Sequence, residues 1–453
     1  MKGLNKKGEQ SQQNHPPKRG EYMRHSLTIT IIGILVLVSM ALVNRPNAIP
    51  VFARKYETSC ITCHTIFPKL NSFGEAYRLN GFQYPEGDED QVKDEPISLG
   101  SDAYKKVFPH AVWPSDIPGT PPLGIRVTNG FNYRKNEQVK TEFLAPSLII
   151  MTAGTFGENV RFYAGAHLFE EGEIGSIDRA YFEISNLFNN KLPENFLNMR
   201  IGQFIPNMVP FANHRGLAVT PYAFNTYSAT ADEFETGHAH GSESFGIETF
   251  QLGVELSGIA SSRFLWGMGF VNGSGAAAEN SSAKDGYFRA AYKFGGMGYD
   301  GSGGTPDPRG RNWIDNSIAV GGFAYFGSYP NDGLVGSNDL TRERYGLDFN
   351  VKSQNTNLFG GWIRGKDEVV EGNLVLNKKY NLGFVELNQV IYPWLTTLAR
   401  YERAEPEDQQ SIERVVAGIA TLYRANIKFV IESSVDPSNV EFSKLIVRLD
   451  FAF

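Results

Sequence analysis

The sequence predicts a mainly β protein, in which an antiparallel transmembrane β-barrel of about sixteen strands follows a small α-helical N-terminal domain. From Pro121 onward no helical period is sustained, and segments of about ten residues alternate apolar with polar side chains, as barrel strands do. The last segment shows this most clearly. From Leu445 every second residue is apolar up to Phe453, and three of the residues on the other face, Lys444, Arg448 and Asp450, are charged.

The composition excludes several classes of protein. The 453 residues carry a net charge of −6, whereas a nucleic-acid binder would present a basic face. Aromatic residues make up 13% of the chain, which excludes disorder. The mean hydropathy of −0.28 excludes a bundle of membrane-spanning helices. Only two cysteines occur, three positions apart, so the fold does not depend on a disulfide framework.

The N-terminus has the pattern of a targeting segment. Residues 1–24 are polar and basic, Leu27–Val43 is apolar and uncharged, and a short stretch then ends in Ala53. This pattern predicts a signal peptide over residues 1–53, cleaved after Ala48 or Ala53, and export through the Sec pathway. Because the apolar run is long, an uncleaved inner-membrane anchor is the alternative. In either case the rest of the chain crosses the inner membrane.

The two cysteines lie in Cys60-Ile61-Thr62-Cys63-His64, the C-x-x-C-H pattern of a covalently attached c-type haem. On a helix, residues three apart face one side, so both thiols can reach the two vinyl groups of one haem. His64 then lies under the iron as the proximal ligand. A zinc ribbon needs a second cysteine pair, and a thioredoxin-like pair needs a βαβ setting; both are missing. A chance match is the third alternative, but the motif follows a signal peptide, where haem attachment occurs.

The sixth ligand of the iron is left open. No methionine occurs between Met40 and Met151, so the cytochrome segment cannot supply one. His110 is the only other histidine of that segment and is a candidate distal ligand, against the alternative of a loop histidine near the domain boundary. Five-coordinate iron and a ligand from the rest of the chain are further alternatives. His/His ligation would give a lower potential than His/Met, because a methionine ligand raises it.

The predicted cytochrome domain and its linker occupy residues 54–120. We expect the haem-bearing helix over Lys55–Thr65 and a second helix over Asn71–Asn80, ended by Gly81 as its C-cap. Such a small core is marginal alone, so the haem must supply much of it, and the domain is expected to plug the barrel. The acidic run Glu86–Glu95 is either a solvated linker or an attractor for a cationic metal or partner.

The barrel is predicted over residues 121–453. Its sixteen candidate strands start near residues 123, 144, 160, 176, 196, 245, 263, 285, 317, 341, 357, 379, 394, 412, 426 and 441. An even number is usual for a bacterial outer-membrane barrel, in which short periplasmic turns alternate with longer outer loops. The connections largely follow this rule: Gln354–Asn355 is tight, whereas Asn207–Ser244 is long.

One connection breaks the rule. Gly295–Asn316 is long and glycine-rich yet falls on the periplasmic side, so either it is a periplasmic excursion or the count is off by a pair. The competing architecture is a soluble β-sandwich or propeller. No blade repeat is visible, however, and the terminal aromatic residue after an alternating strand resembles the recognition signal of bacterial outer-membrane barrels.

The N-terminal motifs resemble those of the fused monohaem cytochrome–porins, which join a c-type cytochrome to an outer-membrane barrel of about sixteen strands. The resemblance covers about 30 residues and is carried by Phe52-Ala53-Arg54-Lys55, the C-x-x-C-H motif, Phe67-Pro68-Lys69-Leu70-Asn71-x-Phe73-Gly74 and Tyr77-Arg78-Leu79-Asn80-Gly81-Phe82. It implies one haem c held by Cys60, Cys63 and His64. Some members of the family are outer-membrane iron oxidases. A weaker resemblance links Arg200-Ile201-Gly202-Gln203-Phe204 to anion-selective porins.

The resulting functional hypothesis is electron transfer across the bacterial outer membrane. The haem would pass one electron at a time from an extracellular donor such as Fe(II) to a periplasmic c-type cytochrome or similar carrier. Whether this makes the chain an Fe(II)-oxidising enzyme is left open, and no catalytic residues are predicted. The two other hypotheses are a passive porin whose haem is structural or sensory, and a metal-reducing conduit that runs electrons outward.

The longest connection holds a candidate site for an external metal. His238 and His240 lie near Glu233, Glu235 and Glu243, and imidazoles with carboxylates suit iron or another divalent metal. By strand parity the connection faces outside. The alternative, which the residues favour, is a polar surface loop with two idle histidines.

Overall fold

Everything described below belongs to one compact unit of the computed structural model, Asn47–Phe453. The structure describes residues 51–85, 87–93, 123–135, 138–156, 159–170, 172–188, 191–229, 233–234, 247–273, 283–304, 311–329, 339–371, 374–437 and 441–452. In these ranges there is no helix with the length and apolar character needed to cross a bilayer, and the apolar run Leu27–Val43 lies outside them.

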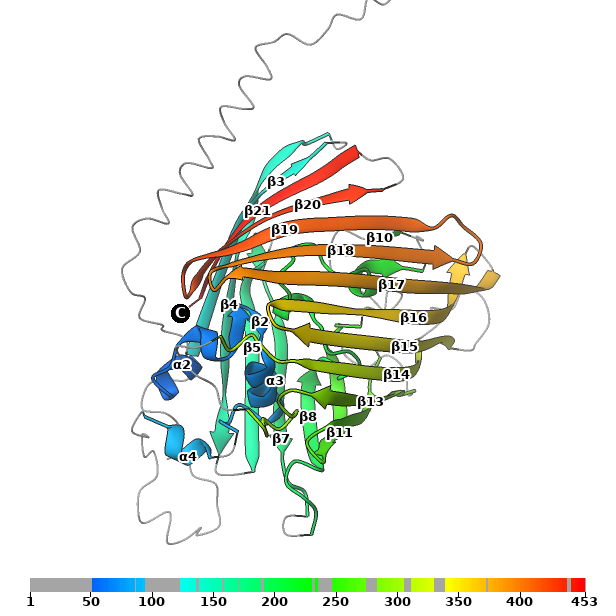
Figure 1. Cartoon of the computed structure of the whole chain (residues 1–453). Helices are drawn as coiled ribbons and strands as arrows, with labels where there is room; N and C mark the ends of the chain where they lie inside the picture. The colour runs from blue at the N-terminus through cyan, green and yellow to red at the C-terminus, as the bar shows by residue number, and fades with distance from the viewer. Residues whose placement is uncertain are drawn as a thin grey trace, which may run out of the picture. The chain divides into compact units, whose positions relative to one another are not determined.

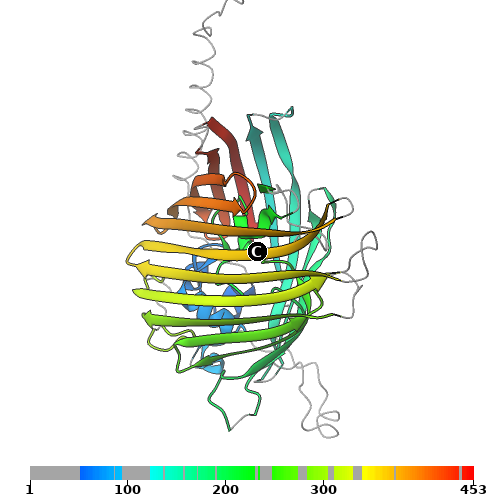
Figure 2. The same ribbon diagram turned by 90° about the vertical axis from the view of Figure 1, so that its right-hand side faces the viewer.

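Sixteen long antiparallel strands close into a barrel (Figures 1 and 2). They are β3 (Leu123–Arg134), β4 (Thr141–Phe156), β5 (Val160–Glu170), β7 (Ile177–Ile184), β8 (Asn198–Phe204), β11 (Gln251–Ala260), β12 (Phe264–Val271), β13 (Asp285–Gly295), β14 (Ser317–Tyr329), β15 (Leu340–Ser353), β16 (Thr356–Glu371), β17 (Leu374–Tyr392), β18 (Leu395–Pro406), β19 (Ile412–Arg424), β20 (Ile427–Asp436) and β21 (Glu441–Ala452). A two-residue strand, β6 (Glu173–Ile174), pairs with β5 ahead of β7. The barrel closes where β21 pairs with β3, from Lys444 opposite Arg134 to Ala452 opposite Arg126.

The strand prediction is confirmed along the whole barrel. Each predicted strand corresponds to one long strand. The largest differences are at β11, predicted near residue 245 and starting at Gln251, and at β17, predicted near 379 and starting at Leu374. The period of two succeeds because each strand has one face toward the interior and one toward the outside.

The two faces of the wall have opposite chemistry. On the last strand, Asp450 is fully buried inside the barrel, whereas Leu449 is 37% exposed on its outer face. Arg161 and Glu183 likewise point inward, and the outward Phe182 is 60% exposed. An apolar outer face with charged side chains inside is the pattern of a barrel that faces lipid, and closure leaves no unpaired sheet edge.

The glycine-rich connection between β13 and β14 is an excursion at the end of the barrel where the tight turns lie. It packs against the N-terminal segment: Ser72 Oγ donates to Asp315 Oδ2 at 2.6 Å, and Met297 packs against Tyr77 and its aromatic neighbours. Tight turns mark the periplasmic end of such barrels. The connection is therefore the periplasmic excursion that the strand count allowed, and the count is not off by a pair.

The N-terminal segment contains α2 (Val51–Lys55), the 3-10 turn η1 (Cys60–Thr62), β1 (His64–Ile66), β2 (Lys69–Leu70), α3 (Ser72–Leu79) and α4 (Asp88–Gln91). The predicted second helix is confirmed as α3, with Asn71 as N-cap and Gly81 at φ +65° beyond its end. In the acidic run, Asp88 binds Lys55 at 2.9 Å and accepts the Tyr56 hydroxyl at 2.5 Å. This carboxylate is therefore a structural anchor rather than part of a solvated linker.

The prediction of one helix over Lys55–Thr65 is wrong. Helix α2 ends at Lys55, because Glu57 adopts a left-handed conformation at φ 47° and the Thr58 N–H bonds back to the Ala53 carbonyl at 2.9 Å. This is a helix-terminating Schellman arrangement. The C-x-x-C-H motif then begins in a separate 3-10 turn.

The connection between β8 and β11 folds back into the barrel. Its described part includes η3 (Asn213–Arg215), α6 (Ala223–Thr226), β9 (Tyr227–Ser228) and β10 (Glu233–Phe234). The ring of Phe211 packs against that of Phe384, on the inner face of β17, with centroids 4.6 Å apart. The expectation that this connection faces outside is therefore wrong for residues 205–229. Strand parity shows only at which end of the barrel a connection starts, and not the direction in which it then runs.

Charged wall residues hold this infolded connection in place. Glu432 of β20 accepts the backbone N–H groups of Val219 and Thr220 at 2.7 and 2.8 Å. Glu402 of β18 accepts the Ala223 N–H at 2.8 Å. Backbone groups inside a barrel need such partners, because an unpaired buried N–H costs about 1–3 kcal/mol.

We predict that Glu432→Ala loosens the connection, because two buried N–H groups lose their acceptor. Limited proteolysis in detergent should cut within residues 205–229 at least about tenfold faster than in the parent protein, since a loss of about 1.4 kcal/mol is tenfold in the open population. Glu405→Ala, at an exposed position on β18, is the control. Equal cleavage rates in the two variants would contradict this account of the anchor.

Candidate functional site

The C-x-x-C-H motif is held by the N-terminus of α3. The Asn71 side chain donates to the carbonyls of Ile61 and Thr62 at 3.2 and 3.0 Å and accepts the Gly74 N–H at 2.9 Å. A Cβ atom on Gly74 would lie 2.1 Å from the Cys63 carbonyl oxygen, so only glycine allows this approach. One asparagine therefore caps α3 and fixes the turn above it.

The turn brings both thiols to one side. The Cys63 N–H bonds to the Cys60 carbonyl at 3.3 Å, and in a 3-10 turn the side chains at positions i and i+3 lie nearly over one another. Burial raises the pKa of Cys60 to about 11 and that of Cys63 to about 12. The free thiols are therefore protonated at pH 7, which disfavours a reactive nucleophile.

His64 is oriented by a backbone carbonyl. Its Nδ1 lies 3.2 Å from the Pro68 oxygen, so the neutral ring donates from Nδ1 and keeps the lone pair of Nε2 for an iron ligand bond. Burial lowers the pKa of His64 to about 4, so the ring is neutral at pH 7. Neutral imidazole is the form that binds a metal.

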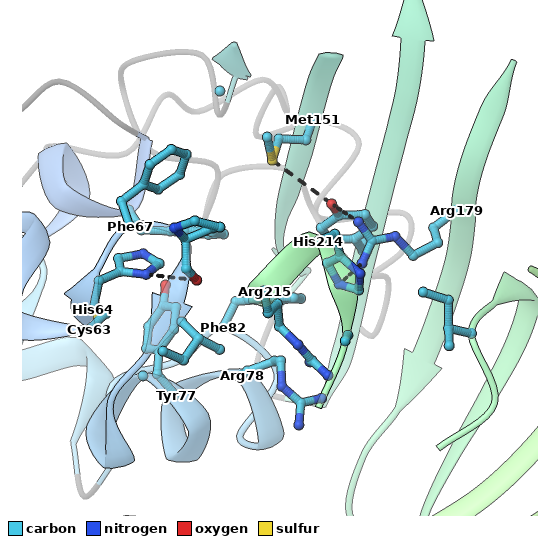
Figure 3. Close-up of a pocket in the computed structure, with 18 of the residues that line it drawn as sticks. Cys63, His64, Phe67, Tyr77, Arg78, Phe82, Met151, Arg179, His214 and Arg215 are labelled. Atoms are coloured by element: carbon cyan, nitrogen blue, oxygen red, sulfur yellow. Dashed lines mark hydrogen bonds between the residues drawn. The ribbon is translucent and has the colours of Figure 1, made fainter. Parts of the chain in front are cut away.

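A cavity of about 340 Å³ lies beside the motif. Figure 3 shows Cys63 and His64 on one side of it and residues from the barrel wall and the infolded connection on the other. The wall residues include Met151, Tyr163, Arg179 and Arg200, and the connection contributes Phe211, His214, Arg215 and Glu248. The cavity is thus enclosed by three parts of the chain that are distant in sequence.

The side of the cavity next to the motif is aromatic. Phe52 stacks on Phe82 with ring centroids 5.4 Å apart, and Tyr77 meets Phe52 edge-on at 5.4 Å. Aromatic walls beside two aligned thiols and a neutral imidazole fit a flat, largely apolar macrocycle attached through thioethers. The donor set also fits, because a haem needs the imidazole nitrogen that the Pro68 carbonyl leaves free.

Three further side chains at the cavity are potential iron ligands that sequence reasoning did not single out. Both ring nitrogens of His167 lie 3.0 Å from carboxylate oxygens, those of Glu170 and Asp178. His214 places Nδ1 3.2 Å from Glu248 and Nε2 3.2 Å from Arg179.

The third of these side chains is Met151. Its sulfur has a weak contact with the Tyr163 hydroxyl at 3.9 Å. Met151 is therefore less engaged than the two imidazoles. Strand parity could have shown that Met151 and His167 face inward, but not at which depth, and it says nothing of His214, which lies in the infolded connection.

Several predicted site residues lie outside the described residues: His110, His238 and His240. Within the described ranges, no group of three or more His, Cys, Asp or Glu side chains is arranged to hold a metal ion. The candidate site that the structure assembles therefore consists of Cys60, Cys63 and His64 with the cavity beside them.

The comparisons with known proteins concern the barrel. No protein-family model matches the chain, and no curated protein sequence matches it. Among solved structures, an anion-selective porin from Comamonas acidovorans is similar at 11% identity and a TM-score of 0.50, covering 73% of this chain and 98% of that chain. OmpF of Salmonella typhi in complex with daunomycin is 12% identical, with a TM-score of 0.49 and coverage of 73% and 97%. At such identities the similarity shows the fold alone, a porin-type barrel.

We predict that Asn71→Ala disrupts the C-x-x-C-H turn, so that less haem would be attached to its cysteines in the purified protein. The variant loses the cap of α3, worth about 1 kcal/mol, and leaves the Ile61 and Thr62 carbonyls without their partner. The measurement is haem absorbance per protein after alkaline pyridine treatment. Asn377→Ala, at an exposed position of β17, is the control and should retain full haem content. Full haem content in Asn71→Ala would show that the turn does not depend on this side chain.

Proposed function

We propose that the chain is an outer-membrane electron-transfer protein of the cytochrome–porin type, with one haem c attached to Cys60 and Cys63 and ligated by His64. It would carry single electrons between an extracellular donor, with Fe(II) as the candidate, and a periplasmic electron carrier. The observation that carries the proposal is the position of the C-x-x-C-H turn, at the tight-turn end of a porin-type barrel and facing a cavity lined by the barrel wall and the infolded connection. The apolar outer face of the barrel supports a location in the bacterial outer membrane.

The contacts of the N-terminal segment with the barrel support the role of a plug. Lys69 Nζ donates to Asn388 Oδ1 of β17 at 2.6 Å, and Lys352 Nζ of β15 donates to Ser72 Oγ at 2.8 Å. Ile66 is buried in a cluster with residues of β18, β19 and β20. A redox group on this segment would therefore be held inside the barrel mouth.

The chain's own residues hold and shield the group. When bound, the haem supplies one-electron redox chemistry at its iron. Asn71 fixes the attachment turn, the Pro68 carbonyl orients His64, and the aromatic rings of Phe52, Tyr77 and Phe82 keep water from that side of the cavity.

The packing of the infolded connection favours electron transfer through the protein over passage of a donor molecule through the barrel. Phe211 lines the cavity and belongs to an aromatic cluster that includes Tyr222, Phe224, Phe359 and Phe384. This cluster packs the connection against the wall at β16 and β17. An external donor would therefore deliver electrons through packed protein, because electrons cross a short path through protein more readily than a bilayer or an open water channel.

The test is anaerobic stopped-flow absorbance of the oxidised full-length protein in detergent, mixed with Fe(II). We expect the α-band of reduced haem to appear rapidly, and no band in the Cys60→Ala/Cys63→Ala double variant. If the haem stays oxidised with Fe(II) but is reduced by dithionite, the Fe(II)-oxidising role fails. A reduction potential of the haem below that of the external metal would then favour an outward conduit.

A passive porin with a structural haem is the second candidate, favoured by the porin-type barrel. It predicts open conductance in planar bilayers and no reduction by external donors. The aromatic packing of the infolded connection argues against a wide channel, so we expect the parent protein to conduct poorly.

A further inference from the structure

Six arginines line the cavity, and four of them have a carboxylate partner. Arg78 binds Glu75 at 2.9 Å, and Arg126 binds Asp450 at 3.1 Å. Arg161 and Arg200 share Glu183, at 3.2 and 2.9 Å. Neutralised guanidinium groups of this kind are ordinary components of a barrel interior.

The other two, Arg179 and Arg215, differ. Among the described residues no carboxylate forms an ion pair with either guanidinium. The Nε of each is buried without a hydrogen-bond partner, as are those of Arg126 and Arg161, so the missing ion pair is what sets the two apart. Arg179 donates to the Tyr163 hydroxyl at 3.0 Å and lies 3.2 Å from the Nε2 of His214. Burial and the neighbouring Arg78 lower the pKa of Arg215 to about 10. Both side chains are partly buried and line the cavity, and a guanidinium group there without an ion-pair partner attracts an anion. This pair therefore points to an anion in the cavity.

The position of the pair indicates which anion. Figure 3 shows Arg179 on the barrel side of the cavity, away from Cys63 and His64, and Arg215 between them, beside Arg78. In a haem attached through its vinyl carbons, the two propionate carboxylates leave the opposite edge of the macrocycle. A haem anchored at Cys60 and Cys63 would therefore direct its two carboxylates away from the motif, toward the part of the cavity where Arg179 and Arg215 lack an ion-pair partner.

We propose that Arg179 and Arg215 bind the propionate carboxylates of the haem and raise its reduction potential. The inference rests on the proposed haem attachment. Arg179 comes from β7 and Arg215 from the infolded connection, so the haem would link these two parts of the barrel interior to the N-terminal segment. His214, held between Arg179 and Glu248, is a positioning residue for the Arg179 guanidinium.

The test uses Arg179→Gln and Arg215→Gln in the full-length protein, with two readouts. Loss of a positive charge near the iron favours its oxidised state, so the equilibrium constant for reduction should fall on the order of tenfold per variant in a potentiometric titration. The carboxylate bands in the redox-induced infrared difference spectrum should also shift. Arg263→Gln is the control, because Arg263 is exposed at the tight-turn end and bonds to the Gly295 carbonyl.

Lysine variants separate contact from charge and guard against misfolding. Arg179→Lys and Arg215→Lys keep the charge but lose the planar fork, so the potential should stay near the parent value while the carboxylate bands shift. Unchanged bands in all four variants would overturn the contact, even if the potential moves in the glutamine variants. A parent potential that responds to inorganic phosphate, lost in the double glutamine variant, would assign the site to a free anion instead. Parent protein without haem would overturn the proposed function itself, before any variant is compared.

Discussion

The interior of this barrel depends on satisfying the backbone of a long segment that folds into it. Much of a chain inside a barrel lies outside any sheet or helix, so many of its N–H and C=O groups must find side chains on the wall. Glu432 and Glu402 accept N–H groups of the connection, and Arg400 donates to the Thr220 carbonyl at 2.6 Å. Because these bonds fix the connection, it can serve as one wall of the cavity beside the C-x-x-C-H motif.

The same constraint explains how so small an N-terminal segment is ordered. A core of this size is marginal alone, and here the barrel supplies much of the missing surface. Asn80 accepts a hydrogen bond from Asn195 in the β7–β8 connection at 2.7 Å, and Asp315 of the periplasmic excursion binds Ser72 and Lys293. The two long connections at the tight-turn end are therefore docking elements for the segment. They account for the departure from short periplasmic turns.

A feature could be predicted from the sequence when it depends on residues that are close together in the sequence, and not when it depends on distant ones. The strands were predictable, because a period of two is local and recurs along every strand. The break after α2 was not, since it depends on the left-handed backbone of Glu57, a residue with no intrinsic preference for it. The motif residues Cys60, Cys63 and His64 were found from spacing alone. Arg179, Arg215 and Met151 were missed as site residues. The depth of Arg179 and Met151 in the barrel is set by the stagger between strands. The position of Arg215 depends on the inward path of the connection, which strand parity does not predict.

The central claim is that Cys60 and Cys63 carry one haem at the mouth of a porin-type barrel. Mass spectrometry of the peptide spanning Cys60–His64, cut from protein purified out of the outer membrane, tests it most directly. We expect this peptide to carry the mass of one haem on both thiols, with no unmodified form in the mature protein. Two free thiols in that peptide, from cells that mature other c-type cytochromes, would contradict it.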